Sequence, residues 1–118
     1  MRVLILGSNS FSGITFSNYL LEKGFSVIGV SQSSFADIKF NPIRFNKNQK
    51  KFKFFKININ KSMNKLFKII ERFKVDVVVD FAGQGMVAES WDYPELTFNT
   101  NVISKIRFYN FLIKKKIF

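Results

Sequence analysis

The chain has 118 residues and a formal charge of +11, with no cysteine and no histidine. This length suits one domain with its own core, and the missing residue types exclude disulfides, zinc sites, thiol nucleophiles and histidine general bases. Acid or base chemistry would have to use Tyr, Lys, Asp or Glu. No segment resembles a signal peptide or reaches the ~20 apolar residues of a membrane span, so we expect a cytoplasmic protein.

Strands and helices alternate along the sequence, each with apolar residues at its own period. In chain order, the sequence predicts a strand at 2–6, a helix at 11–23, a strand at 25–30, a loop at 31–49, a strand at 52–57, a helix at 62–73, a strand at 75–81, a loop to residue 94 and a helix at 95–115. This alternation is typical of a parallel sheet with helices on both faces. We therefore expect an α/β fold.

The positive charge is concentrated in one third of the chain. Residues 39–74 hold twelve Lys and Arg against one acid, Glu71, whereas the remaining residues hold seven basic and seven acidic side chains. The same third is rich in Phe, Ile and Asn, a composition that an AT-rich coding sequence produces without selection for a basic surface. Steering of an anionic ligand and contact with an acidic surface are the alternatives. We do not expect the chain to bind nucleic acid.

The turn after the first strand carries the first functional signal. It is Gly7-Ser8-Asn9-Ser10-Phe11-Ser12-Gly13, between a strand and a helix. A diphosphate is favoured at a helix N-terminus where no side chain intervenes, and Gly7 and Gly13 leave that space. Ser10 stands where the dinucleotide-binding pattern has its middle glycine, so an ordinary strand-turn-helix is the alternative.

Four segments in order resemble the extended short-chain dehydrogenase/reductase family, the NAD(P)-dependent sugar-nucleotide epimerases and dehydratases, including the 4,6-dehydratases. They are the glycine turn at 5–13, Asn58-Ile59-Asn60 where the family has Asp-Leu-x-Asp, Asp80-Phe81-Ala82-Gly83-Gln84 where it has Asn-Leu-Ala-Ala-Gln, and Asn99-Thr100-Asn101-Val102 around an Asn-Val pair. Each motif has at least one substitution, and the spacing of the four supports the resemblance more strongly. The resemblance covers nearly the whole chain.

The resemblance implies a Rossmann-type, doubly wound parallel sheet of four strands in the order 3-2-1-4. Residues 1–118 would be the NAD(P)-binding domain, without strands 5 and 6 and without the substrate domain, as the N-terminal part of a longer enzyme. The family's catalytic Tyr-x-x-x-Lys pair would also be missing, so we predict no catalytic residue and no activity of the chain alone. Tyr19 and Lys23 have that spacing but lie on the first helix, and Tyr109 is followed by Ile113.

The resemblance also implies which positions contact the cofactor. They are Gly7, Asn9, Ser10, Phe11 and Gly13 at the pyrophosphate, Asn58 and Ile59 at the adenine, Ala82, Gly83 and Gln84 at the ribose and nicotinamide, and Asn101 beside them. Other roles are open for several of these residues and their neighbours: turn residues at Asn58 and Asn60, a helix cap at Asn101, loop freedom at Gly83 and Gly85, and packing at Trp91 and Tyr93.

The end of the second strand bears on the choice of cofactor. In the family a carboxylate there accepts the ribose hydroxyls and repels a 2′-phosphate, but this chain has Ser31, Gln32 and Ser33. The hydroxyls, with Lys39 or Arg44 nearby in sequence, favour NADP over NAD without excluding either.

The valine-rich segment 75–81 has the composition of a strand covered on both faces, yet it would form an edge of this sheet. An apolar edge invites pairing with a second chain, so a homo-oligomer is a further expectation. The leading hypothesis is the nucleotide-binding part of a nucleotide-sugar epimerase or dehydratase. A non-catalytic dinucleotide-binding or partner-binding module is the alternative.

Overall fold

The computed structural model describes residues 1–35, 41–83 and 87–118. Its strands form one parallel sheet and are β1 (Arg2–Leu6), β2 (Ser26–Ser31), β3 (Phe52–Lys56) and β4 (Val77–Asp80). The strand order is β3-β2-β1-β4, which confirms the predicted α/β fold and its 3-2-1-4 order. The order reverses between β1 and β4, and in such sheets ligands bind in the crevice beyond the carboxyl ends of the strands.

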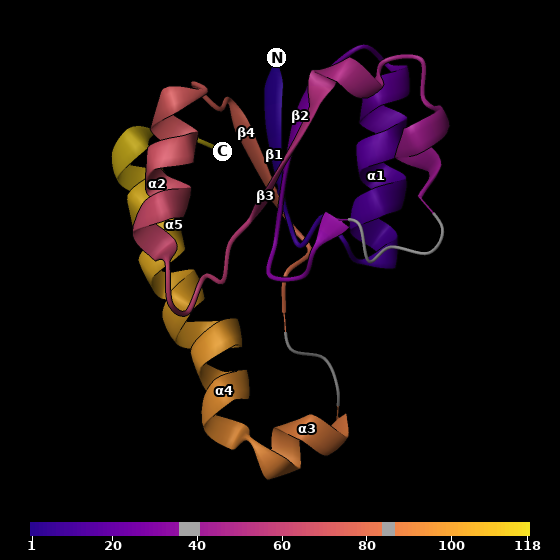
Figure 1. Cartoon of the computed structure of the whole chain (residues 1–118). Coiled ribbons are helices and arrows are strands. Elements are labelled where there is room, and N and C mark those ends of the chain that lie inside the picture. Colours follow the sequence, from indigo (N-terminus) through magenta and orange to yellow (C-terminus); the bar gives the residue numbers. More distant parts are fainter. Residues whose placement is uncertain (36–40, 84–86) are drawn as a thin grey trace.

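Helices cover both faces of the sheet (Figure 1). Helix α1 (Phe11–Glu22) lies on one face, and α2 (Met63–Arg72) and α5 (Ser104–Lys115) lie on the other. Successive residues of a strand point to opposite faces, so β1 supplies both halves of the core. Val3 and Ile5 pack on the α1 side, whereas Leu4 and Leu6 pack on the side of α2 and α5.

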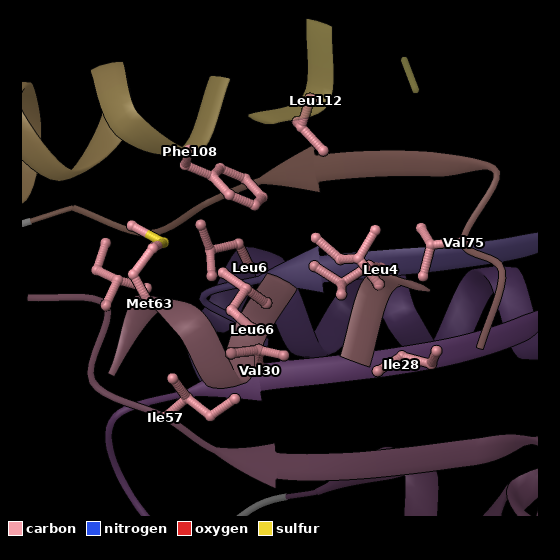
Figure 2. Close-up of a cluster of buried hydrophobic side chains, with 12 residues drawn as sticks. Leu4, Leu6, Ile28, Val30, Ile57, Met63, Leu66, Val75, Phe108 and Leu112 are labelled. Carbon is pink, nitrogen blue, oxygen red and sulfur yellow. The ribbon is translucent and has the colours of Figure 1, made fainter. Parts of the chain in front are cut away.

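Phe108 anchors α5 to the sheet. Figure 2 shows its ring pointing from the helix toward Leu6, with Leu112 one turn further along the same helix. Phe108 is fully buried, and Leu66 and Met63 of α2 belong to the same cluster. The two helices thereby hold the β4 side of the sheet in place.

The predicted helix at 95–115 is present, but it is not α-helical throughout. It consists of α4 (Pro94–Phe98), a π-helical segment η4 (Asn99–Ile103) and α5. Because Asn101 lies inside this run of helix, it is not the N-cap residue that one alternative assigned to it. π-Helical turns are rare and often occur at functional sites.

Two segments predicted as loops contain short helices, so those loop predictions were wrong in part. The first holds 3₁₀ turns η2 (Pro42–Phe45) and η3 (Gln49–Lys51), and the second holds α3 (Val87–Asp92). Asn41 caps η2 by accepting a hydrogen bond from the amide of Ile43 at 3.1 Å. An Asn cap followed by proline is a helix-start signal, which the scattered polar residues of this segment concealed.

The strand order confirms that the valine-rich segment forms an edge of the sheet, but the strand is shorter than predicted and its edge is partly covered. Val75 lies outside β4 and is buried, while Val78 packs on the α5 side and Val79 on the α1 side, both half-buried. The amide of Val78 donates a hydrogen bond to the carbonyl of Phe118 at 2.6 Å. Strand β4 is the outer strand of the described sheet, but its side chains are covered because helices flank it on both faces.

Candidate nucleotide-binding site

A cavity of about 460 Å³ lies at the carboxyl ends of the strands, where the strand order predicts the ligand crevice. Its lining combines apolar strand ends with polar residues from the turns that follow them: Leu6, Gly7, Asn9, Ser10, Val30, Ser31, Gln32, Ser33, Ile57, Ile59, Phe81, Ala82, Gly83, Leu96 and Thr100. An apolar cavity with a few convergent polar groups is the usual form of a small-molecule site.

Gly7 brings two chain segments into direct contact at the bottom of this site. It has φ +80°, and a Cβ at this residue would lie 2.6 Å from the amide nitrogen of Ala82 and 2.7 Å from the carbonyl carbon of Phe81. Its own amide donates to the carbonyl of Val30 at 2.8 Å. Only glycine meets both demands here, because the space is filled by backbone and the conformation is left-handed.

Ser10 explains how the turn works without its middle glycine. It is the N-cap of α1: its Oγ accepts a hydrogen bond from the amide of Gly13 at 3.0 Å and donates one to the carbonyl of Gly7 at 2.8 Å. The hydroxyl is therefore occupied by the backbone of its own turn. A Cβ at Gly13 would lie 2.3 Å from the Gly7 carbonyl oxygen, so this glycine lets the helix approach the strand.

Asn9 links the glycine turn to the end of β2. Its Nδ2 donates to the carbonyl of Ser33 at 3.0 Å and to the Ser33 hydroxyl at 2.9 Å, and its amide donates to Ser31 Oγ at 3.2 Å. Its Oδ1 is buried and has no hydrogen-bond partner among the described residues. A buried acceptor in a cavity wall is costly unless a ligand or water donates to it.

The structure brings nine of the fourteen predicted cofactor residues together in the lining of the cavity. They are Gly7, Asn9, Ser10, Ser31, Gln32, Ser33, Ile59, Ala82 and Gly83.

The other five predicted residues are not among the described residues that line the cavity. Phe11 has an exposed side chain, and Gly13 packs behind the turn; neither lines the cavity. Asn58 also lies outside the lining, and its Oδ1 accepts from the amide of Asn60 at 2.9 Å, as the turn alternative expected. Asn101 Oδ1 would lie 3.3 Å from a Cβ at Gly83, and Gln84 falls outside the described residues.

Of the two basic residues named for a 2′-phosphate, the structure describes only Arg44. Arg44 lies in η2, is exposed and does not line the cavity. Lys39 falls outside the described residues. The polar residues that line the cavity at the end of β2 are Ser31, Gln32 and Ser33.

Sequence analysis missed a charged cluster beside the cavity. Asp80, the last residue of β4, forms an ion pair with Lys105 of α5 at 2.5 Å, with side chains 15% and 9% exposed. Tyr109 donates a hydrogen bond to Asp80 Oδ2 at 2.6 Å. The signal was available, because Lys105 shares the helix face of Phe108 and Leu112, where an apolar residue is expected.

Tyr109 and Tyr19, the two tyrosines considered above, both lie away from the cavity. Burial, followed by the hydrogen bond and charge of Asp80, raises the pKa of Tyr109 to about 12, which disfavours a phenolate. Tyr19 is half-exposed on α1, with the Lys23 ammonium 5.5 Å from its ring centre. Tyr19, Lys23 and Tyr109 all lie outside the lining of the cavity.

Comparison with known proteins places this fold and this turn in one family. The family model described as GDP-mannose 4,6 dehydratase matches residues 4–116. A curated UDP-glucose 4-epimerase from Mycolicibacterium smegmatis is 30% identical over 107 residues, which are 91% of this chain and 33% of the relative.

Solved structures of UDP-glucose 4-epimerases have the same fold as this chain. The UDP-glucose 4-epimerase of Thermotoga maritima, crystallised with UDP-glucose, is 25% identical with a TM-score of 0.79, and the match covers 99% of this chain and 35% of that one. The Bifidobacterium longum UDP-glucose 4-epimerase, in complex with NAD+ and UDP, is 22% identical with a TM-score of 0.82 and the same coverage. The chain spans about a third of the length of these relatives.

In the described part of the chain, no helix is long and apolar enough to cross a bilayer. The dehydratase family model matches almost every residue, and the parallel sheet has the order β3-β2-β1-β4 with a glycine turn after β1. This chain therefore belongs to the NAD-dependent epimerase/dehydratase family of extended short-chain dehydrogenases/reductases.

Proposed function

We propose that the chain binds a nicotinamide dinucleotide in the cavity beyond β1, and that it is the nucleotide-binding part of an NAD(P)-dependent nucleotide-sugar epimerase or dehydratase. The observation that carries the proposal is the cradle around Gly7. A Cβ at Gly7 would collide with the backbone of Phe81 and Ala82, and Gly7 lines the cavity.

The site has the features that a diphosphate needs. In the first turn of α1, the amides of Gly13 and Ile14 are satisfied by Ser10, which leaves those of Phe11 and Ser12 without a partner among the described residues. Unpaired amides at a helix N-terminus favour an anion, and the helix dipole adds to this. The buried Asn9 Oδ1 offers an acceptor to a ribose hydroxyl or an ordered water.

The adenosine end is built from hydroxyls rather than a carboxylate. Ser31 and Ser33 are held by Asn9, and Gln32 between them is exposed at the cavity rim. The described residues that line this end include no carboxylate to repel a 2′-phosphate, so NADP is the favoured cofactor, although the Bifidobacterium relative was solved with NAD+.

The preference for NADP has its own test. Ser33→Asp places a carboxylate at the ribose, and it is expected to weaken NADP relative to NAD by about tenfold. Ser34→Asp, one residue further from the Asn9 contact, is the matched control. An unchanged NADP/NAD ratio in Ser33→Asp would contradict the placement of the adenosine ribose.

The nicotinamide end lies at Ala82 and Gly83, where small residues allow close approach. The bound cofactor would supply hydride transfer, while the protein positions it and excludes competing reactions. The Thermotoga relative was crystallised with UDP-glucose, which supports a nucleotide sugar as the substrate class. Among the described residues that line the cavity there is no counterpart of the family's proton-transfer pair, so the chain alone is expected to bind cofactor without turning over substrate.

The proposal is tested by titrating the folded chain with NADP, NAD and 5′-AMP by calorimetry. Saturable binding to one site, abolished or weakened in Gly7→Ala, is expected. A folded, monodisperse chain that binds none of the three would overturn the proposal.

A second proposal is that the chain self-associates as a partner-binding module. Large apolar side chains are exposed along α3, α4 and α5, and an apolar surface of this kind often marks an interface. These side chains include Trp91, Tyr93, Leu96, Phe98, Ile106 and Ile113. Sedimentation over a hundredfold range of concentrations tests it, and a monomer throughout would contradict it.

A further inference from the structure

We infer that Lys105 is a positioning residue of the dinucleotide site: paired with Asp80, it fixes the segment Phe81–Gly83 that lines the nicotinamide end of the cavity. This inference rests on the proposed function, because it concerns how the same cavity is held in shape. It assigns a role to a buried charge that lies outside the cavity lining.

The contacts of the pair converge on one peptide segment. The Lys105 ammonium donates to both carboxylate oxygens of Asp80 and, at 2.7 Å, to the carbonyl of Ala82. Asp80 Oδ1 in turn accepts from the amide of Ala82 at 2.9 Å. Both polar backbone groups of Ala82 are therefore held by the ion pair, one by each partner.

Ala82 is the residue whose backbone meets Gly7. A Cβ at Gly7 would lie within 2.8 Å of the Ala82 amide nitrogen and Cα. The segment after β4 thus rests directly on the glycine turn, and Phe81, Ala82 and Gly83 all line the cavity. A shift of Ala82 would change the nicotinamide end of the cavity and leave Ser31–Ser33, at the adenosine end, in place.

Because the Lys105–Asp80 pair is buried, it can hold the segment Phe81–Gly83 in one position. All three ammonium donors of Lys105 have acceptors on Asp80 and Ala82, and the side chain is only 9% exposed. Tyr109 provides a further donor to Asp80. A buried charge that has every partner in place holds its geometry, whereas removal of one partner leaves the other charge uncompensated.

The test compares ligands that occupy different parts of the cavity. NAD and NADP reach the nicotinamide end, whereas 5′-AMP occupies the adenosine end alone. Lys105→Met is expected to weaken both dinucleotides by about tenfold and 5′-AMP by less than about twofold, since it removes charged hydrogen bonds on one side only. Lys115→Met is the matched control, because Lys115 lies on the same helix in an exposed ion pair with Glu71 at 2.8 Å.

Two further measurements keep the inference testable if Lys105→Met does not fold. The double variant Asp80→Asn with Lys105→Met removes the uncompensated charge, and it should fold while showing the same selective loss of dinucleotide affinity. In the wild-type chain, the Ala82 amide should exchange slowly with solvent even without ligand, because Asp80 holds it.

The outcomes separate this inference from the proposed function. If the wild-type chain binds neither dinucleotide nor 5′-AMP, the proposed function fails. If the wild-type chain binds all three, but the Lys105 variants lose nothing or lose all three equally, the inference is overturned. Fast exchange of the Ala82 amide in the wild-type chain would also overturn it.

Discussion

Gly7 and Gly24 allow the contact at the bottom of the cavity to be measured apart from backbone strain. Both glycines are left-handed, with φ +80° at Gly7 and +86° at Gly24. A Cβ at Gly7 would meet backbone atoms of Phe81 and Ala82 at 2.6 to 2.8 Å, whereas a Cβ at Gly24 would meet nothing within 4 Å. Alanine has a similar conformational cost at either site, because both sites are left-handed. At Gly7 alanine would also displace the segment after β4, whereas at Gly24 it would meet nothing.

The expected magnitudes follow from this difference. A left-handed alanine costs about 1 kcal/mol, so Gly24→Ala should lower the free energy of unfolding by about that amount. Gly7→Ala adds the cost of pushing a packed backbone aside, about 1–3 kcal/mol, for a total of about 2–4 kcal/mol. It should also weaken NADP and NAD binding, because Ala82 and Gly83 move with the displaced segment, while Gly24→Ala should bind normally.

Urea unfolding followed by far-ultraviolet circular dichroism measures the two stabilities, and calorimetry measures the two affinities. Equal losses of stability in the two variants would refute the reasoning, since they would mean that no backbone contact exists at Gly7. Normal dinucleotide affinity in Gly7→Ala would show that the cavity does not depend on this turn.

Two other predictions concern α5. Phe108→Ala should lower the free energy of unfolding by about 3–5 kcal/mol, because Phe108 is fully buried, whereas Ile113→Ala, at a position 72% exposed, should change it by less than about 0.5 kcal/mol in urea unfolding. The pKa of Tyr109 is raised to about 12 from an ordinary value of 10, so its contribution to stability is present below pH 10 and is lost as the pH rises to about 12. Tyr109 is 43% exposed, so solvent screening keeps this contribution below about 1 kcal/mol. Tyrosinate absorbance should show a component with a pKa of about 12 in the wild-type chain that is absent from Tyr109→Phe, and identical titrations of the two proteins would contradict the Asp80 contact.

The order of the strands could be predicted because local and global signals agreed. Apolar runs such as 77–79, and a glycine turn between strand and helix, belong to a parallel sheet, and the resemblance supplied the order. The short helices were missed for a physical reason. Pro42–Phe45 and Val87–Asp92 are too short for a hydrophobic period, and their starts depend on a cap such as Asn41.

The site was predictable where backbone conformation dictates residue type and less so where side chains converge from distant segments. Gly7, Ala82 and Gly83 were named because small residues at strand ends leave space for a ligand. Lys105 was not named, because its role depends on Asp80, 25 residues away in sequence. Asn58 shows the opposite case: a residue placed by resemblance closes a turn with Asn60 outside the cavity lining.

The central claim is that a dinucleotide rests on the turn between β1 and α1. Amide chemical shifts recorded while NADP is titrated into the labelled, folded chain test it most directly. We expect saturable shifts concentrated at Gly7, Asn9, Ser31 and Ala82, with little change along α2. Saturable shifts confined to α2, or no shifts at all, would contradict the claim.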